Sequence, residues 1–153
     1  MRIQTRTLGA VEATPESFLT LPDGLVGYEA EREFALVAPA DYAPFHWLLS
    51  FSDPDLALPV LPARLVAPDY EPALGASDRR ALGCAESDAL EVWLIASVDP
   101  ARGLTVNLRA PIVVHAGTRL ARQVVLSDGR FAIDQAIAPS TKADHSAAQQ
   151  KAA

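Results

Sequence analysis

Five side chains of the kinds that hydrolases use lie within ten positions of one another. They are His46, Ser50, Ser52, Asp53 and Asp55. A serine within hydrogen-bond reach of a histidine, itself oriented by a carboxylate, forms a nucleophile and its general base. Two carboxylates can instead bracket a glycosidic bond. The backbone that carries these residues has to be placed before any of this chemistry is assigned.

Residues 45–51 alternate as a strand does, and this alternation separates the candidate catalytic groups. The large apolar side chains at positions 45, 47, 49 and 51 share one side, and burying each is worth about 1.5–3 kcal/mol. His46 and Ser50 share the other side, but four residues of strand hold their backbones roughly 13 Å apart. The proline between Asp53 and Asp55 is typical of a turn. The pattern predicts a core strand that ends in an acidic turn, not an active site.

The other residues that could carry chemistry are few and scattered. Cys84 is the only cysteine, which excludes an intrachain disulfide and a cysteine-rich zinc site. The three histidines, His46, His115 and His145, have no metal-ligand spacing, and no phosphate-binding glycine loop occurs. We expect no catalytic residue, no cofactor and no metal. One alternative stays open, a small β-barrel enzyme or ligand-binding protein with a site near His46 or His115.

Short strand-like segments dominate the chain. Residues 90–99 are apolar on both faces in their middle, as in a central strand, and Pro111 indicates a bulge or strand switch. Asp128-Gly129 predicts a hairpin. Helix is expected only over residues 77–83, which start at a capping-type serine, and in a turn over 28–34. The sequence predicts an all-β fold with one or two short helical turns, built as a small closed or partly open β-barrel-like domain.

The length of 153 residues predicts a single domain, which we place over residues 1–138. Residues 139–153 are polar and alanine-rich, so we expect a mobile tail there. No apolar run approaches the roughly 20 residues of a bilayer span, and the first residues do not resemble a secretory signal. With a single cysteine, the cytoplasm is the expected location.

Charge is distributed unevenly and excludes one class of partner. The formal net charge is −6, and residues 1–101 alone hold 16 acidic and 6 basic side chains, a net charge of −10. Residues 102–153 hold 3 acidic and 7 basic side chains, a net charge of +4. An acidic body repels phosphate backbones, so direct binding of nucleic acid is not expected. The same charge attracts a basic protein and speeds its encounter.

The order of motifs along the chain resembles one family. Blocks with family-like order and spacing cover nearly the whole domain, and two of them, W-L-x-S-x-x-D-P-D-L-A and N-L-x-A-P-I, are specific together. The blocks are LPDGLVGY (21–28), PFHWLLSFSDPDLALPVLP (44–62), APDYEP (67–72), TVNLRAPIVVH (105–115) and RQVVL (122–126). The chain is similar to the flagellar assembly factor FliW family. Three positions depart from the family pattern: Leu49 stands where glutamine is usual, the usual aromatic near Leu58 is missing, and Pro59 interrupts a stretch that is commonly aliphatic. Pro59 also removes a backbone donor, which suits an edge or a bulge.

The resemblance implies a binding protein and not an enzyme. Proteins of this family are cytoplasmic β-barrel-like factors that bind flagellin. When free of flagellin they bind CsrA, a basic RNA-binding homodimer, and relieve its repression of flagellin mRNA translation. We expect the same partners here, with a monomer as the free state. The candidate partner-binding residues are exposed acidic and aromatic groups beside the shared motifs: Asp53, Asp55, Asp69, Tyr70 and Glu71.

Overall fold

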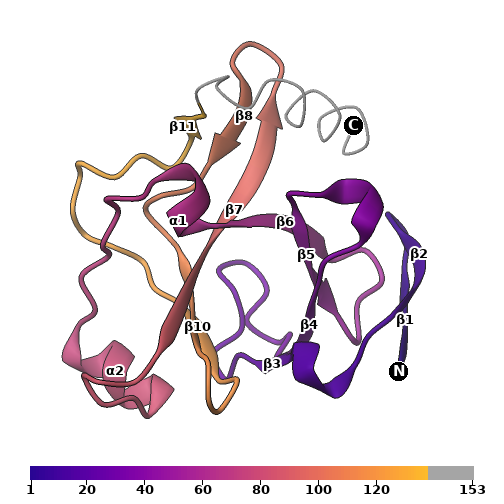
Figure 1. Cartoon of the computed structure of the whole chain (residues 1–153), viewed down its shortest axis with the longest axis horizontal. Coiled ribbons are helices and arrows are strands. Elements are labelled where there is room, and N and C mark those ends of the chain that lie inside the picture. Colours follow the sequence, from indigo (N-terminus) through magenta and orange to yellow (C-terminus); the bar gives the residue numbers. More distant parts are fainter. Residues whose placement is uncertain (138–153) are drawn as a thin grey trace.

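The computed structural model describes residues 1–137 of the chain, so the tail expected at 139–153 lies outside the described residues (Figure 1). Strands dominate, and the helices are short, as predicted. In chain order the elements are β1 (Arg2–Thr5), β2 (Gly9–Glu12), η1 (Pro15–Ser17), β3 (Phe18–Thr20), β4 (Glu33–Val37), η2 (Ala40–Tyr42), β5 (His46–Ser50), β6 (Ala57–Pro62), α1 (Ala63–Val66), α2 (Ala76–Leu82), β7 (Leu90–Asp99), β8 (Gly103–Val106), β9 (Ile112–His115), β10 (Ala121–Gln123) and β11 (Gln135–Ala136).

The main sheet curls until its two edges meet at one point. Its strands follow the order β10-β9-β7-β6-β5-β4-β3, and β8 and β11 branch from β7. An isolated parallel bridge joins Thr20 at the end of β3 to Leu120 just before β10. The N–H of Thr20 donates to the carbonyl of Arg119 there, at 3.1 Å. One bridge does not make a closed ladder, so the prediction of a partly open β-barrel-like domain is confirmed.

The long strand β7 connects the barrel to its branch. Its first residues pair with β9, its middle with β6 and its last four with β8. Residues 107–111 bulge between β8 and β9, where Pro111 predicted a bulge or switch. The carboxamide oxygen of Asn107 accepts the backbone N–H groups of Arg109 at 2.9 Å and Ala110 at 3.1 Å, which fixes the shape of the bulge.

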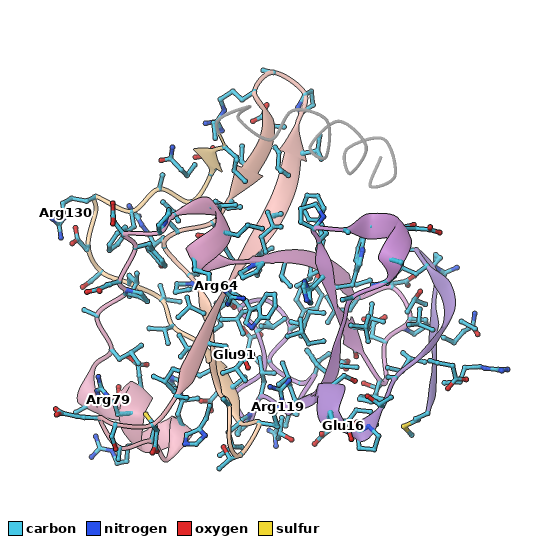
Figure 2. The ribbon with its side chains drawn as sticks, in the orientation of Figure 1. Glu16, Arg64, Arg79, Glu91, Arg119 and Arg130 are labelled. Atoms are coloured by element: carbon cyan, nitrogen blue, oxygen red, sulfur yellow. The ribbon has the colours of Figure 1, made fainter. Side chains whose placement is uncertain are left out.

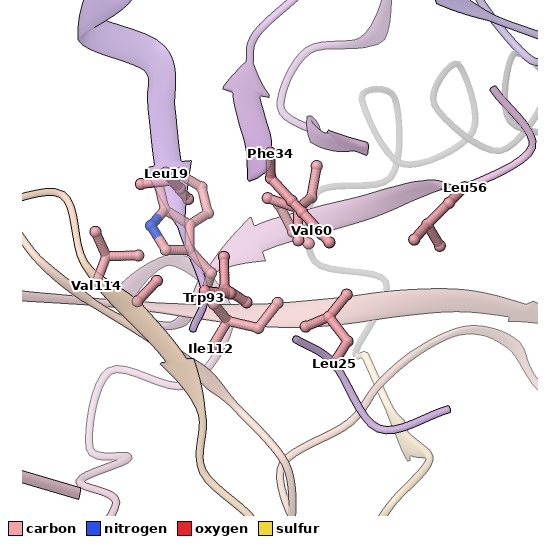
Figure 3. Packing of buried hydrophobic residues seen from close by; sticks show 11 residues of the cluster. Leu19, Leu25, Phe34, Leu56, Val60, Trp93, Ile112 and Val114 are labelled. Carbon is pink, nitrogen blue, oxygen red and sulfur yellow. The ribbon is translucent and has the colours of Figure 1, made fainter. Parts of the chain in front are cut away.

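Two apolar layers lie on opposite faces of β5. The barrel interior is filled from most of its strands, and Phe34, Val60, Trp93 and Ile112 are at its centre (Figure 3). The hairpin of β1 and β2 covers the other face, where Trp47, 3% exposed, lies in a second cluster. The strand predicted over 45–51 is therefore buried on both faces. The alternation predicted burial of the Trp47 face only. Leu48 on the opposite face, 2% exposed, lies in the barrel interior, which strands distant in sequence complete.

Two predicted elements are absent. Residues 28–34 form no helix: they hold a single turn, in which the N–H of Glu31 donates to Tyr28 at 3.1 Å, and β4 begins at Glu33. Asp128-Gly129 lies in a turn but joins no hairpin. β10 ends at Gln123, and the chain continues to β11, which pairs with β8 instead of with β10.

The helix predicted over 77–83 is present as α2, but its cap differs from the expected one. The N-cap is Gly75, not Ser77, and the carboxylate of Asp78 accepts the N–H of Gly75 at 2.9 Å. The helix ends at Gly83, whose φ of 62° lies in the left-handed region that glycine favours.

Candidate functional site

The Ser50 hydroxyl is a structural group of the β5–β6 turn. Ser50 is 1% exposed, and its Oγ donates to Oε2 of Glu31 at 2.9 Å. It also accepts the backbone N–H groups of Ser52 at 3.2 Å and Asp53 at 3.1 Å. The hydroxyls of Ser52 and Ser50 both donate to Glu31. These bonds, the one from Ser52 more than the one from Ser50, hold the pKa of the Glu31 carboxyl below its ordinary value. Ser50, at the end of β5, is thus committed to holding the turn that follows the strand.

His46 packs against an aromatic ring. The ring centroids of His46 and Trp93 are 4.6 Å apart, and the rings are tilted by 57°. Burial lowers the pKa of His46 below its ordinary value, which favours the neutral ring. The Trp93 indole donates to Glu91 at 3.2 Å, and Glu91 pairs with Arg119 at 3.5 Å (Figure 2). The histidine therefore belongs to a packed aromatic and ionic cluster.

His115 uses both ring nitrogens to hold a turn. Its Nδ1 lies 3.1 Å from the N–H groups of both Gly117 and Thr118, so it accepts, and Nε2 carries the proton. Nε2 then donates to the carboxylate of Asp88 at 3.0 Å. The pKa of Asp88 lies below its ordinary value. The larger cause is the hydrogen bond from the backbone N–H of Ala85, and the smaller is the bond from His115. Neither ring nitrogen of His115 is available to act as a base on a ligand.

Asp53 and Asp55 lie in the acidic turn that the sequence predicted. The Asp53 carbonyl accepts the N–H of Leu56 at 3.1 Å, and its carboxylate accepts the N–H of Asp55 at 2.9 Å. Arg6 pairs with the Asp55 carboxylate and donates its own N–H to Pro54 at 2.8 Å. The Arg6 guanidinium lowers the pKa of Asp55. The turn is thus attached to the loop between β1 and β2.

Tyr70 is half-buried, whereas its two acidic neighbours are exposed. Its hydroxyl donates to the carbonyl of Leu108 at 2.5 Å, and its ring meets Phe131 edge-on at 5.2 Å. Burial raises the pKa of Tyr70 to about 12. Asp69 and Glu71 point to solvent on either side of it.

The five candidate residues therefore fall into two separate groups. Asp53 and Asp55 adjoin the β1–β2 hairpin. Asp69, Tyr70 and Glu71 follow α1, and of these Tyr70 contacts the bulge between β8 and β9. The structure does not bring the two groups together.

The sequence did not single out an exposed apolar pair in the loop over residues 21–28. Val26 is 64% exposed and Tyr28 is 45% exposed. The loop is fixed, because the N–H of Val26 donates to the side chain of Gln123 at 2.8 Å and Gly24 adopts a φ of 66°. The sequence feature that could have indicated this exposed pair is the position of two apolar residues around Gly27, just after a turn that contains proline and glycine.

The described residues carry a net negative charge, and most of the arginines after residue 101 already form ion pairs with carboxylates. Residues 1–137 hold 11 of the 13 basic and 18 of the 19 acidic side chains, a net charge of −7. Arg102 and Arg122 each contact two carboxylates, and Arg119 and Arg130 each contact one. The exterior that remains suits a basic partner.

Among residues 1–137, no group of His, Cys, Asp and Glu side chains is placed to hold a metal ion. No helix in this part of the chain is long and apolar enough to cross a membrane.

Comparison with known proteins gives the family. A model of the family described as FliW protein matches residues 2–137. This chain belongs to the FliW family. A curated FliW relative from Bdellovibrio bacteriovorus, named flagellar assembly factor FliW, is 38% identical over 138 residues. That alignment covers 90% of this chain and 79% of the relative.

Other FliW proteins agree in sequence and in fold. The flagellar assembly factor FliW of Thermotoga neapolitana is 33% identical over 131 residues, which cover 84% of this chain and 88% of that protein. A crystal structure of the flagellar assembly factor FliW superposes with a TM-score of 0.79 at 26% sequence identity. It covers 91% of this chain and 98% of that one.

Proposed function

We propose that this FliW-family protein is a cytoplasmic flagellar assembly factor that acts by binding other proteins. It binds flagellin, and when free of flagellin it binds CsrA and relieves CsrA's repression of flagellin mRNA translation. The single observation that carries this proposal is the family match over residues 2–137, with relatives that are named flagellar assembly factors. The free protein is a monomer in this proposal.

The surface chemistry supports a switch between two protein partners. The net charge of −7 over residues 1–137 favours fast encounter with a basic protein such as CsrA. Ser50, His46 and His115 are engaged in internal contacts, so the geometry does not favour an enzyme built around them. Asp53, Asp55, Asp69, Tyr70 and Glu71 stay the proposed contact residues, of which the exposed carboxylates Asp55, Asp69 and Glu71 are the most accessible.

The proposal is tested by co-elution with flagellin and CsrA from the same organism. We expect a complex with unassembled flagellin in size-exclusion chromatography and a second complex with CsrA that added flagellin dissolves. Loss of both complexes would contradict the proposal. A flagellin complex without a CsrA complex would restrict the protein to the flagellin-binding role.

The acidic turn has its own test. Asp53→Lys and Asp55→Lys should each slow CsrA association and weaken its dependence on salt, because they remove attraction for a basic partner. Glu86→Lys, which makes the same charge change on an exposed loop after α2, serves as the control. Equal association rates for the turn and control variants in stopped-flow measurements would remove the turn from the CsrA contact.

A further inference from the structure

The ladder between β6 and β7 stops half-way along both strands. Pairing runs from Pro62–Trp93 to Val60–Ile95 and goes no further. The next residue of β6, Pro59, has no N–H to give to β7. Beyond this point β7 continues beside β8, away from β6 (Figure 1).

The alternation of an antiparallel ladder shows which backbone groups face the resulting gap. The N–H of Asn107 donates to the carbonyl of Ile95 at 2.9 Å, so Ile95 faces β8 and Val98 faces β6. The N–H of Ser50 donates to Leu56 at 3.1 Å, so Leu56 faces β5 and Ala57 faces β7. Val98 and Ala57 thus turn their N–H and carbonyl groups into the gap, where the ladders of residues 1–137 give them no strand partner.

The gap opens into an uncharged, mainly apolar pocket of about 280 Å³, which we call the β6–β7 cleft. Phe45, Trp47 and Leu104 line it with residues of β6 and β7, and Thr7 and Ser97 add two hydroxyl groups. Val98 is 47% exposed there. The residues that line the cleft include no charged side chain, although the described chain carries a net charge of −7. Its chemistry therefore differs from that of the acidic exterior.

We propose that the β6–β7 cleft seats an extended, uncharged segment of a protein partner. The segment pairs with the backbone of Val98 and inserts one branched aliphatic or aromatic side chain against Phe45 and Trp47. A helix satisfies its own backbone and cannot use the open strand edge, whereas an extended chain can. Residues 138–153 of this chain contain no large apolar side chain to insert.

This inference rests on the proposed function, because it assigns the cleft to flagellin. The basic partner, CsrA, suits the acidic exterior, and a neutral cleft gives it no attraction. The two partners would then meet surfaces of different chemistry on one small protein. Binding at the cleft should accordingly depend little on salt.

The test compares two valines that are both exposed, Val98 and Val125, which is 63% exposed and is not among the cleft residues. Purified unassembled flagellin is titrated into wild-type protein, Val98→Asp and Val125→Asp by isothermal titration calorimetry. We expect Val98→Asp to weaken flagellin binding about tenfold or more, because it places a charge at an apolar contact. Val125→Asp should bind within about twofold of wild type. In hydrogen exchange, the Val98 amide should exchange readily in the free protein and become protected in the complex.

The outcomes separate the two proposals. If wild-type protein does not bind flagellin, the proposed function fails, and the assigned occupant of the cleft fails with it. If wild-type and Val98→Asp bind equally, or the Val98 amide gains no protection, the cleft is not the site and the proposed function stands. Two results would assign the cleft to another occupant and overturn the inference. One is a wild-type dimer that Val98→Asp dissociates; the other is competition by a peptide of residues 138–153.

Discussion

Ser50→Ala distinguishes a structural role of the Ser50 hydroxyl in the β5–β6 turn from a catalytic one. Ser50 is 1% exposed, and its hydroxyl makes one donated and two accepted hydrogen bonds. Each such bond contributes about 0.5–1.5 kcal/mol net, and three would sum to roughly 1.5–4.5 kcal/mol. The two amides belong to a turn that solvent reaches once the hydroxyl is gone, so the loss should be about 2 kcal/mol.

Urea unfolding followed by tryptophan fluorescence measures this loss, because both tryptophans, Trp47 and Trp93, are buried. The midpoint should fall with an unchanged slope, and Tm should drop by about 4–8 °C for a chain of this size. Ser52→Ala is the matched control. Its hydroxyl is exposed and also donates to Glu31, so its removal should cost less than about 1 kcal/mol.

A serine nucleophile would give a different result. Ser50→Ala would then keep its stability and lose an activity. An unchanged midpoint for Ser50→Ala, or equal losses for Ser50→Ala and Ser52→Ala, would refute the assignment of this hydroxyl to the turn.

Three further predictions concern the scaffold. Gly24→Ala should cost about 3 kcal/mol or more in unfolding free energy, since the new methyl would lie 2.5 Å from a backbone oxygen. Gly27→Ala is the control: Gly27 has a φ of 87° but open space around it, so this change should cost about 1 kcal/mol. Tyr70→Phe should lower the unfolding free energy by about 1 kcal/mol, and spectroscopic titration of the wild type should show one of the three tyrosines ionising at a pKa of about 12, with a lower value contradicting its burial. The pKa of His46 is depressed in the folded state, so its contribution to stability is present above the unfolded value of about 6.5 and is lost as the pH falls through the folded pKa. His46→Gln should flatten this acid limb in urea titrations, and an unaltered limb would assign it to other groups.

Local patterning was enough to place the two strands predicted over 45–51 and 90–99. The strand over 90–99, the helix over 77–83 and the acidic turn at Asp53 and Asp55 all appear where the sequence put them, because apolar spacing and turn chemistry act over a few residues. Leu49, which departs from the family pattern, is fully buried, as its place in the alternation predicted.

Features that depend on distant partners could not be predicted in this way. Asp128 and Gly129 have the chemistry of a turn, but the destination of the chain is set by Arg109, which donates to the carbonyl of Phe131 at 2.9 Å. Tyr70 was selected as an exposed aromatic group, yet its hydroxyl bonds to Leu108, which lies 38 positions further along. No local pattern encodes such a contact.

Pro59 also bears on how the chain is made. β6 ends at Pro62 and β7 begins at Leu90, 28 positions later. Translation at about 5–20 residues per second leaves the β6 edge unprotected on the ribosome for roughly 1.5–6 s. An open edge is a template for pairing with neighbouring nascent chains. A proline whose missing donor faces that edge makes β6 a poor template during the interval, so the residue that shortens the native ladder also guards the unfinished protein against aggregation.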